Sequence, residues 1–186
     1  MKKKIVVFAS GTGSNFVNIT KKIHSHRLLA QVCLLVSNNP NCGAVKFASK
    51  NKMDVFIYNS DRFPGDNEQN SLIQKLEDYD LDLILLAGYM KKISKKLVDR
   101  FKNKIMNIHP SLLPLYGGKG FYGTKVHKEV FKNKDKESGA TVHFIDANYD
   151  TGPILIQKKI KLKTDDSAEE IAQKVLKIEH EIYFEA

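Results

Sequence analysis

Short apolar runs alternate with amphipathic segments along almost the whole chain. Residues 4–9 are nearly continuously apolar, and after a glycine-containing turn Phe16, Ile19 and Ile23 recur at the spacing of one helix face. The same alternation continues to the C-terminus. It predicts strands over 4–9, 31–36, 54–57, 81–87, 105–108, 140–144 and 154–162. It also predicts helices over 16–23, 44–51, 71–79, 94–101, with Ser94 as its cap, and 125–133. A last helix opens at a capping box, Ser167 to Glu170, and is expected to bury Ile171, Val175, Ile178 and Ile182.

The predicted strands indicate how the sheet is built. Near-continuous apolar strands separated by helices are typical of a parallel sheet that is covered on both faces. Residues 154–162 instead alternate between apolar and polar positions, as in a strand at a sheet edge. We therefore expect a doubly wound α/β fold with a mostly parallel central sheet, helices on both faces and an antiparallel edge strand toward the C-terminus. No linker composition interrupts residues 1–186, so a single domain is predicted, with a phosphate-binding half over about 1–100 and a catalytic half over about 101–186.

Composition narrows the class of protein. The 186 residues are 42% hydrophobic and 27% charged, as expected for one compact domain that needs neither disulfides nor structural metal. The net charge is +9, from 30 basic and 21 acidic residues. Only three of the basic residues are arginines, and the lysines are scattered over almost every segment. This distribution argues against nucleic-acid binding, which favours clustered arginines, and leaves a general attraction for anionic small molecules.

Cysteine usage and apolar run length indicate the compartment. Cys33 and Cys42 form no metal-binding or disulfide pattern. The basic residues at 2–4 precede an apolar run of only five residues, whereas a secretory core needs about 7 to 15. No stretch approaches the roughly 20 apolar residues of a membrane span. We expect a cytoplasmic protein with no membrane partner.

The first candidate site is the turn Gly11-Thr12-Gly13-Ser14-Asn15 between the first strand and the first helix. Glycines permit a sharp turn, and free N–H groups at a helix start bind anions. An ordinary strand-to-helix turn capped by Ser14 or Asn15 is the alternative. A dinucleotide site would need a third glycine where Phe16 stands and an acidic residue after the second strand. The turn therefore favours a phosphate over NAD.

The second and third candidates follow later strands. Asn107 and His109 lie two residues apart on a strand, so their side chains share a face, and an amide beside an imidazolium can stabilise an oxyanion. A hydrogen-bonded histidine at a strand end explains the same residues without chemistry. Asp150, in the acidic loop 146–153, is expected to lie against His109 and raise its pKa, unless it only accepts local turn hydrogen bonds. His127 and His143 have no neighbouring ligand set and are expected in the core or at the surface.

These segments together resemble a known family. GTGSN at 11–15, LAGYM at 86–90, NIHPSLLP at 107–114, GATVHF at 139–144 and DTGPILIQ at 150–157 occur in the same order as in the phosphoribosylglycinamide formyltransferases, folate-dependent enzymes of purine synthesis. The resemblance implies transfer of a formyl group from 10-formyltetrahydrofolate, as co-substrate, to the amine of 5'-phosphoribosylglycinamide, with no metal. It further implies small-molecule substrates, a monomer or homodimer, and a cis peptide bond between Leu113 and Pro114.

The resemblance also carries residue roles. It implies a catalytic trio of Asn107, His109 and Asp150, a ribosyl-phosphate contact at Gly13, Ser14 and Asn15, and a glycinamide contact at Glu179. The folate pocket that it implies comprises Met90, Lys91, Lys92, Ile93, Asn107, Asp146, Ala147, Asn148 and Tyr149.

The chain departs from the family pattern in three places. The arginine usual near 64–67 is absent, Lys91 replaces the usual arginine after Met90, and residues 118–122 include a short insertion. Methionyl-tRNA formyltransferase and formyltetrahydrofolate hydrolase are alternatives, but each usually carries an extra domain for which 186 residues leave no room. A non-catalytic nucleotide-binding module or an NAD oxidoreductase would use the glycine turn without needing Asn107 and His109 together.

Overall fold

The computed structural model describes residues 1–146 and 148–186. Each predicted strand and helix is present, with ends shifted by a few residues. The strands are β1 (Lys3–Phe8), β2 (Ala30–Ser37), β3 (Asp54–Ile57), β4 (Leu83–Leu86), β5 (Ile105–His109), β6 (Glu137–Phe144) and β7 (Ile154–Lys161). The helices are α1 (Ser14–Ser25), α2 (Gly43–Lys50), α3 (Asn70–Glu77), α4 (Lys95–Arg100), α5 (Thr124–Lys132) and α6 (Ala168–Glu185).

The strands hydrogen-bond in the order β3-β2-β1-β4-β5-β6-β7. β1 runs parallel to β2 and β4, and β2 runs parallel to β3. β7 pairs antiparallel with β6 at the edge of the sheet. These pairings confirm the predicted class, a mostly parallel α/β sheet with an antiparallel edge strand near the C-terminus.

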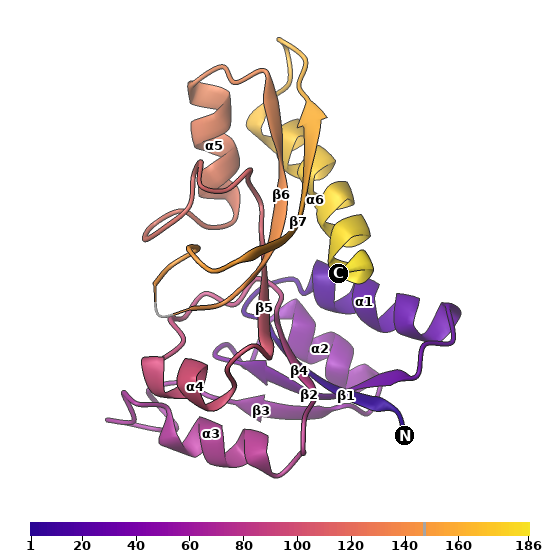
Figure 1. The fold of residues 1–186 in the computed structure, drawn as a ribbon, viewed down its shortest axis with the longest axis vertical. Coiled ribbons are helices and arrows are strands. Elements are labelled where there is room, and N and C mark those ends of the chain that lie inside the picture. The colour runs from indigo at the N-terminus through magenta and orange to yellow at the C-terminus, as the bar shows by residue number, and fades with distance from the viewer. Residues whose placement is uncertain (147) are drawn as a thin grey trace. The chain divides into compact units, whose positions relative to one another are not determined.

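The chain divides into two compact units, residues 1–106 and 107–186. The division falls close to the predicted boundary between halves, and a single domain over 1–186 stays a prediction. In the first unit α1 and α2 pack together against the β2 and β3 side, and α3 contacts α4 (Figure 1). Right-handed crossovers account for this arrangement. The connections from β1 through β2 to β3 place α1 and α2 on one face of the sheet, and those that lead from β3 through β4 to β5 place α3 and α4 on the other face. The first unit's core includes Val6, Val7 and Phe8, which are completely buried.

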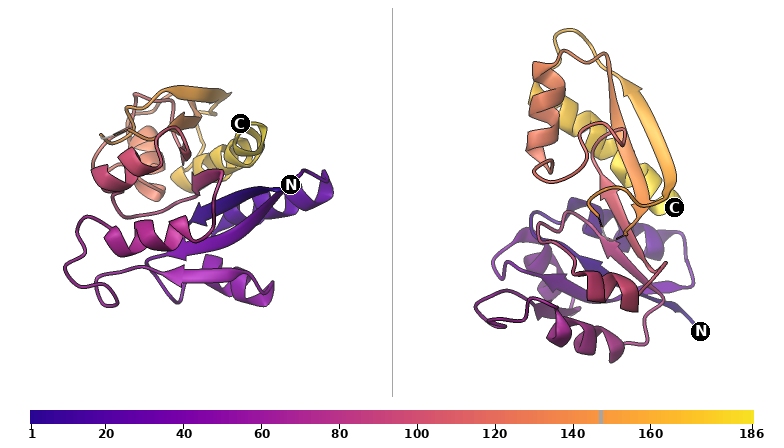
Figure 2. Two further views of the ribbon diagram at one scale, coloured as in Figure 1. Left: turned by 60° about the horizontal axis from the view of Figure 1, so that its bottom comes forward. Right: turned by 60° about the vertical axis from the view of Figure 1, so that its left-hand side comes forward.

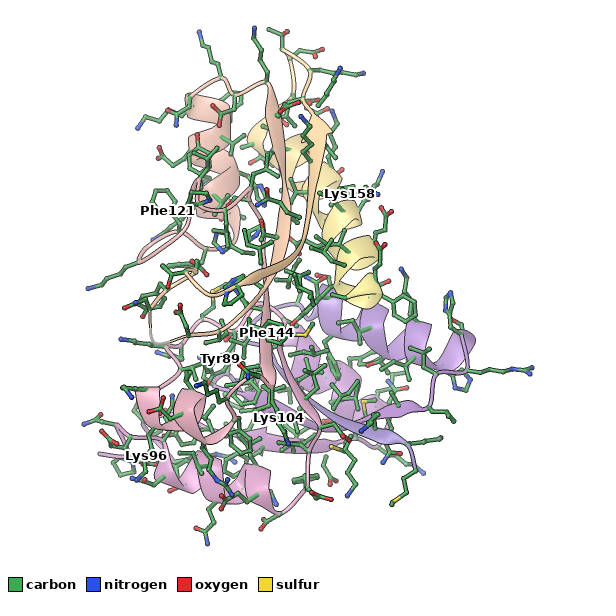
Figure 3. All side chains as sticks on the ribbon, in the orientation of Figure 1. Tyr89, Lys96, Lys104, Phe121, Phe144 and Lys158 are labelled. Carbon is green, nitrogen blue, oxygen red and sulfur yellow. The ribbon has the colours of Figure 1, made fainter. Side chains whose placement is uncertain are left out.

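In the second unit α6 packs against β6 and β7 and lies beside α5 (Figure 2). Ser167 and Glu170 form the predicted capping box at the start of α6. Ile178, expected on the buried side of α6, is only half-buried, because the helix turns Glu179 and Tyr183 inward instead. Lys158 on β7, labelled in Figure 3, pairs with Glu181 on α6.

Two local features expected from the sequence are also present. The Ser94 side chain caps α4 by accepting a hydrogen bond from the Leu97 N–H. The peptide bond between Leu113 and Pro114 is cis. Across the described part of the chain, no helix combines the length and apolar character needed to cross a bilayer.

Candidate active site

The end of β5 carries two of the predicted catalytic side chains. Asn107 and His109 are separated by one residue, so the pleat of the strand directs both to the same side. The His109 side chain is buried, with 4% of the residue exposed. The Asn107 amide nitrogen lies 3.1 Å from Nε2 of His143 on β6. The strand ends at His109, and residues 110–123 form a loop.

The loop between β6 and β7 brings Asp150 to these residues. Its Oδ1 lies 3.7 Å from His109 Nδ1 and 3.5 Å from His143 Nε2. Its Oδ2 accepts a hydrogen bond of 2.9 Å from the Gly118 N–H. Asp150 adopts the left-handed backbone conformation, with φ 55°, and Gly152 fits so closely against the Phe144 carbonyl oxygen that a Cβ there would collide with it. The structure therefore brings together all three residues of the predicted trio within the second unit.

His143 is a fourth member of this group that the sequence argument missed. It is completely buried, as a core residue would be, but its ring lies between Asn107 and Asp150. The expected core position of His143 is confirmed, but its polar partners could not be predicted from its sequence neighbours, because they come from β5 and from the β6–β7 loop. Strand alternation offered one signal: His143 shares a face with Thr141, whose hydroxyl donates to the Ser111 carbonyl.

Two backbone carbonyl groups determine which ring nitrogen of each imidazole carries a proton. The Tyr116 carbonyl oxygen lies 2.7 Å from His109 Nε2, so Nε2–H donates to it and Nδ1 faces Asp150. The Phe144 carbonyl oxygen lies 2.9 Å from His143 Nδ1 in the same way. The Asn107 amide nitrogen, 3.1 Å from His143 Nε2, is a hydrogen-bond donor only. This bond uses one N–H of Asn107 and leaves the other for a ligand.

Burial and charge together lower the pKa values of His109 and Asp150. Burial lowers the pKa of His109 below its ordinary value, and the nearby Asp150 carboxylate and the Tyr116 carbonyl offset this only partly. Asp150 lies against His109 and acts to raise this pKa, as expected, but removal of the ring from water outweighs the ion pair, so the net shift is downward. Burial acts to raise the pKa of Asp150, but His143, His109 and the Gly118 N–H together bring it below its ordinary value. At neutral pH the group contains a carboxylate anion and a neutral His109.

The first unit contains the predicted anion-binding turn. Gly13 has a left-handed backbone, with φ 77°, and precedes α1 without a side-chain cap. Ser14 and Asn15 are the first residues of α1, whose first turn contains no acidic side chain. A Cβ on Gly13 would lie 2.8 Å from the Ala44 Cβ, so a glycine is required both by the space and by the backbone. The turn therefore offers helix N–H groups to an anion without competition from a carboxylate.

The residues that the resemblance assigns to the folate pocket differ in accessibility. Met90, Lys91 and Lys92 are exposed, whereas Ile93 is buried. The Met90 N–H donates to the Ser10 hydroxyl at 2.8 Å, which ties the start of this segment to the end of β1.

The remaining predicted binding residues lie in the second unit. The Asp146 carboxylate accepts hydrogen bonds from the Asn148 N–H and the Thr151 hydroxyl, so it stabilises its own loop. Asn148 and Tyr149 are exposed, and Glu179 is buried on α6. Ala147 lies outside the described residues.

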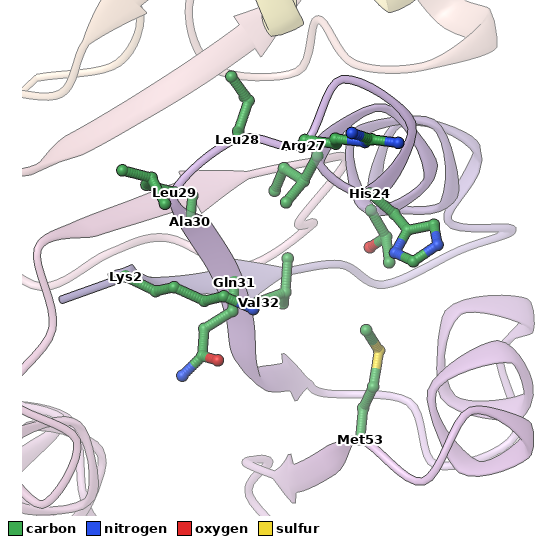
Figure 4. A pocket seen from close by; sticks show the side chains of 11 residues that line it. Lys2, His24, Arg27, Leu28, Leu29, Ala30, Gln31, Val32 and Met53 are labelled. Carbon is green, nitrogen blue, oxygen red and sulfur yellow. The ribbon is translucent and has the colours of Figure 1, made fainter.

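A separate hollow in the first unit has a volume of about 440 Å³ and lies at the start of β2 (Figure 4). It is lined mainly by apolar side chains, among them Ile23, Leu28 and Val32, with Arg27 at its border. None of the predicted site residues lines it. Within residues 1–146 and 148–186, no group of three or more His, Cys, Asp or Glu side chains is arranged to hold a metal ion.

Comparison with known proteins identifies the class to which this site belongs. Residues 3–186 match the formyl transferase family. The chain therefore belongs to the formyl transferase family.

Several similar proteins within that family have the same name. The chain is 42% identical, over 99% of its length, to the chloroplastic phosphoribosylglycinamide formyltransferase of Arabidopsis thaliana, and 36% identical, over 97% of its length, to the phosphoribosylglycinamide formyltransferase of Bacillus subtilis. It covers 91% of the Bacillus protein but only 64% of the Arabidopsis protein and 59% of the one from Vigna unguiculata. The chain thus spans about three fifths of the length of these two plant relatives.

Solved structures agree with the sequence comparison. The glycinamide ribonucleotide transformylase 1 structures from Symbiobacterium toebii and Geobacillus kaustophilus each superpose with a TM-score of 0.90, at 30% and 31% identity. Each match covers 99% of this chain, and the two matches cover 85% and 96% of those chains.

Proposed function

We propose that this chain transfers a formyl group from 10-formyltetrahydrofolate to the amine of 5'-phosphoribosylglycinamide, a step of de novo purine biosynthesis. The observation that carries the proposal is the group formed by Asn107, His143, Asp150 and His109 around the end of β5. Family membership and the names of the relatives support formyl transfer to this acceptor.

The chemistry requires one proton to be moved while charge develops on an oxygen. The glycinamide amine attacks the formyl carbon, a C–N bond forms, and the carbonyl electron pair moves onto the oxygen. The free N–H of Asn107 stabilises that oxyanion. Neutral His109 takes the surplus proton of the amine at Nδ1, the nitrogen that does not bind the Tyr116 carbonyl. The intermediate then collapses, the carbonyl re-forms, the bond between the carbon and N10 of the folate breaks, and His109 gives the proton to N10 and becomes neutral again.

Asp150 stabilises the protonated form of His109 during the reaction. Its anionic carboxylate lies 3.7 Å from Nδ1 of His109, so the imidazolium formed during the reaction is stabilised by an opposite charge. The low pKa of His109 means that the ring begins neutral and can accept the proton. This order differs from a His109 that is already cationic in the free protein, which the sequence argument assumed.

Binding roles follow from the same proposal. Gly13, Ser14 and Asn15 bind the ribosyl phosphate through the N-terminus of α1. Glu179 recognises the glycinamide end. Met90, Lys91, Lys92, Ile93 and the loop 146–150 contact the folate, with exposed Met90 and the two lysines offering side chains and Ile93 its backbone. The reaction as written uses no metal, and a cytoplasmic location and a monomer or homodimer remain predictions.

Competing acceptors test the proposal. Formyl transfer from 10-formyltetrahydrofolate is measured with phosphoribosylglycinamide, with initiator tRNA and with water alone. We expect a formylated glycinamide product and no comparable rate with the other two. Dominant transfer to tRNA, or release of free formate, would instead favour the methionyl-tRNA formyltransferase or hydrolase alternatives.

Variants test the assigned residues. We expect His109→Ala, Asn107→Ala and Asp150→Asn each to lower kcat by about tenfold or more, as removal of one oxyanion donor does in other enzymes. His24→Ala removes an exposed imidazole at the end of α1 and serves as the matched control. Near-normal rates in all three site variants would end the assignment of this group as the active site.

A further inference from the structure

We propose that Tyr116 is a positioning residue for His109 and Asp150, and that its phenol group acts through Asp135 and Asn133. This inference rests on the proposed function, because it concerns the same site. Tyr116 is not part of the predicted trio. Its phenol contacts Asp135 and Asn133 after α5 and holds the turn in place, and its backbone carbonyl contacts His109.

The turn formed by residues 116–118, called here the 116–118 turn, touches both reacting groups. At one end the Tyr116 carbonyl oxygen accepts a 2.7 Å hydrogen bond from His109 Nε2. At the other end the Gly118 N–H donates a 2.9 Å hydrogen bond to Asp150 Oδ2. Between them lies Gly117, where an added Cβ would collide with Leu113 Cδ2 at 2.6 Å and would be in ordinary contact with the Asp150 Cβ at 3.5 Å. One short turn therefore sets the orientation of both the imidazole and the carboxylate.

The side chain of Tyr116 fixes this turn to α5. Its hydroxyl donates to Asp135 Oδ2 at 2.6 Å and accepts from the Asn133 amide at 2.7 Å. Both partners follow the last turn of α5. The Tyr116 ring also packs edge-on against Phe121, labelled in Figure 3, with ring centroids 6.0 Å apart. The phenol is thus held by two polar contacts and one aromatic contact.

The backbone of Tyr116 explains why such an anchor is needed. Its φ is 53°, a left-handed conformation that residues with a side chain adopt reluctantly. Gly118, two residues later, has a φ of 91°, which a glycine adopts without strain. Without the phenol contacts the turn would relax toward ordinary backbone angles and draw the carbonyl away from His109.

The carbonyl contact matters because it selects the reacting nitrogen of His109. A hydrogen bond from Nε2–H keeps the proton on Nε2, so that Nδ1 of the neutral ring retains its lone pair toward Asp150. The charged or titratable groups that act on this ring are Asp150, His143 and, from α5, His127. Of these, Asp150 favours the cationic ring, as does the Tyr116 carbonyl, while His143 opposes it. Loss of the carbonyl contact should lower the pKa of His109.

The test combines ring NMR with kinetics on the full chain. Tyr116→Phe keeps the ring and removes the hydroxyl, and Asp135→Ala removes the acceptor without altering Tyr116. Nitrogen-15 spectra of the imidazoles report the tautomer of His109 directly. We expect a single Nε2–H tautomer in the unaltered chain and a mixture of tautomers, with a lower pKa, in both variants. We also expect kcat to fall by about tenfold, with KM for both substrates within about twofold and the acidic limb of the kcat profile moved to lower pH.

Matched controls separate this role from a general loosening of the loop. Tyr122→Phe removes a hydroxyl from the same loop that accepts a hydrogen bond from the exposed Lys125, and it should leave the His109 spectrum and kcat unchanged. If the double variant Tyr116→Phe with Asp135→Ala costs no more than either single variant, the two residues act as one unit.

Two outcomes are distinguishable from failure of the proposed function. An unchanged His109 tautomer and pKa in both Tyr116→Phe and Asp135→Ala would overturn this inference, whatever the enzyme does. A shifted tautomer in a chain that transfers no formyl group would leave the inference standing and refute the proposed function.

Discussion

His127 gives the most direct quantitative prediction from the structure. It lies on the inner face of α5 with 6% of its surface exposed, and its Nδ1 is buried and has no hydrogen-bond partner in the part of the chain that the structure describes. Burial, reinforced by repulsion from His109 when that ring is protonated, lowers the pKa of His127 to about 4. The folded protein therefore resists protonation of this ring across a range in which the unfolded chain accepts a proton.

The sign and size of the effect follow from linkage. Well above pH 6.5 the ring is neutral in both states, so His127 adds no dependence on pH there. As the pH falls below that value the unfolded chain binds a proton that the folded chain does not, and stability decreases until about pH 4. With these two pKa values the free energy of unfolding falls by about 2.5 kcal/mol between pH 7 and pH 4.5 because of this one residue. That is a large part of a typical stability of about 5 to 15 kcal/mol.

Urea unfolding at pH 7 and pH 4.5 measures this term. In His127→Leu the fall in unfolding free energy between the two pH values should be smaller than in the unaltered chain by about 2.5 kcal/mol. Each protein is compared with itself, so a uniform change in stability cancels. His24→Leu, on the exposed end of α1, is the matched control and should keep the full fall. Equal falls in His127→Leu and the unaltered chain would refute the reasoning.

Two further variants probe other parts of the molecule. Gly13→Val should weaken binding of phosphoribosylglycinamide more than binding of folate in separate titrations, because its Cβ would press on Ala44 beside the start of α1; Gly11→Val, whose Cβ meets no atom within 4 Å, is the control, and equal weakening of both ligands would contradict the separation of the two binding roles. Ser167→Ala should lower the free energy of unfolding by about 1 kcal/mol through loss of the α6 capping box, measured by urea unfolding, whereas an effect no larger than that of Ser25→Ala on α1 would contradict it.

The sequence predicted the order of elements because strand and helix periods are local properties. Parallel apolar strands, the caps at Ser94 and Ser167, and the pairing of His109 with Asp150 all followed from short stretches of residues and their place in the sheet. The role of His143 did not, because its partners arrive from β5 and from the β6–β7 loop. The direction of the His109 pKa was likewise beyond the sequence, since it depends on how completely the ring is removed from water.

Gly152 fits closely against the Phe144 carbonyl oxygen, so the two ends of the β6–β7 loop lie against each other. The Phe144 N–H also donates to the Pro153 carbonyl, so the two ends of the loop are joined through main-chain atoms and do not depend on the identity of the side chains between them. An exposed position such as Asn148 can then vary without displacing the carboxylate of Asp150. Evolution or a protein engineer could alter ligand preference at this rim while the proton-handling group stays in place.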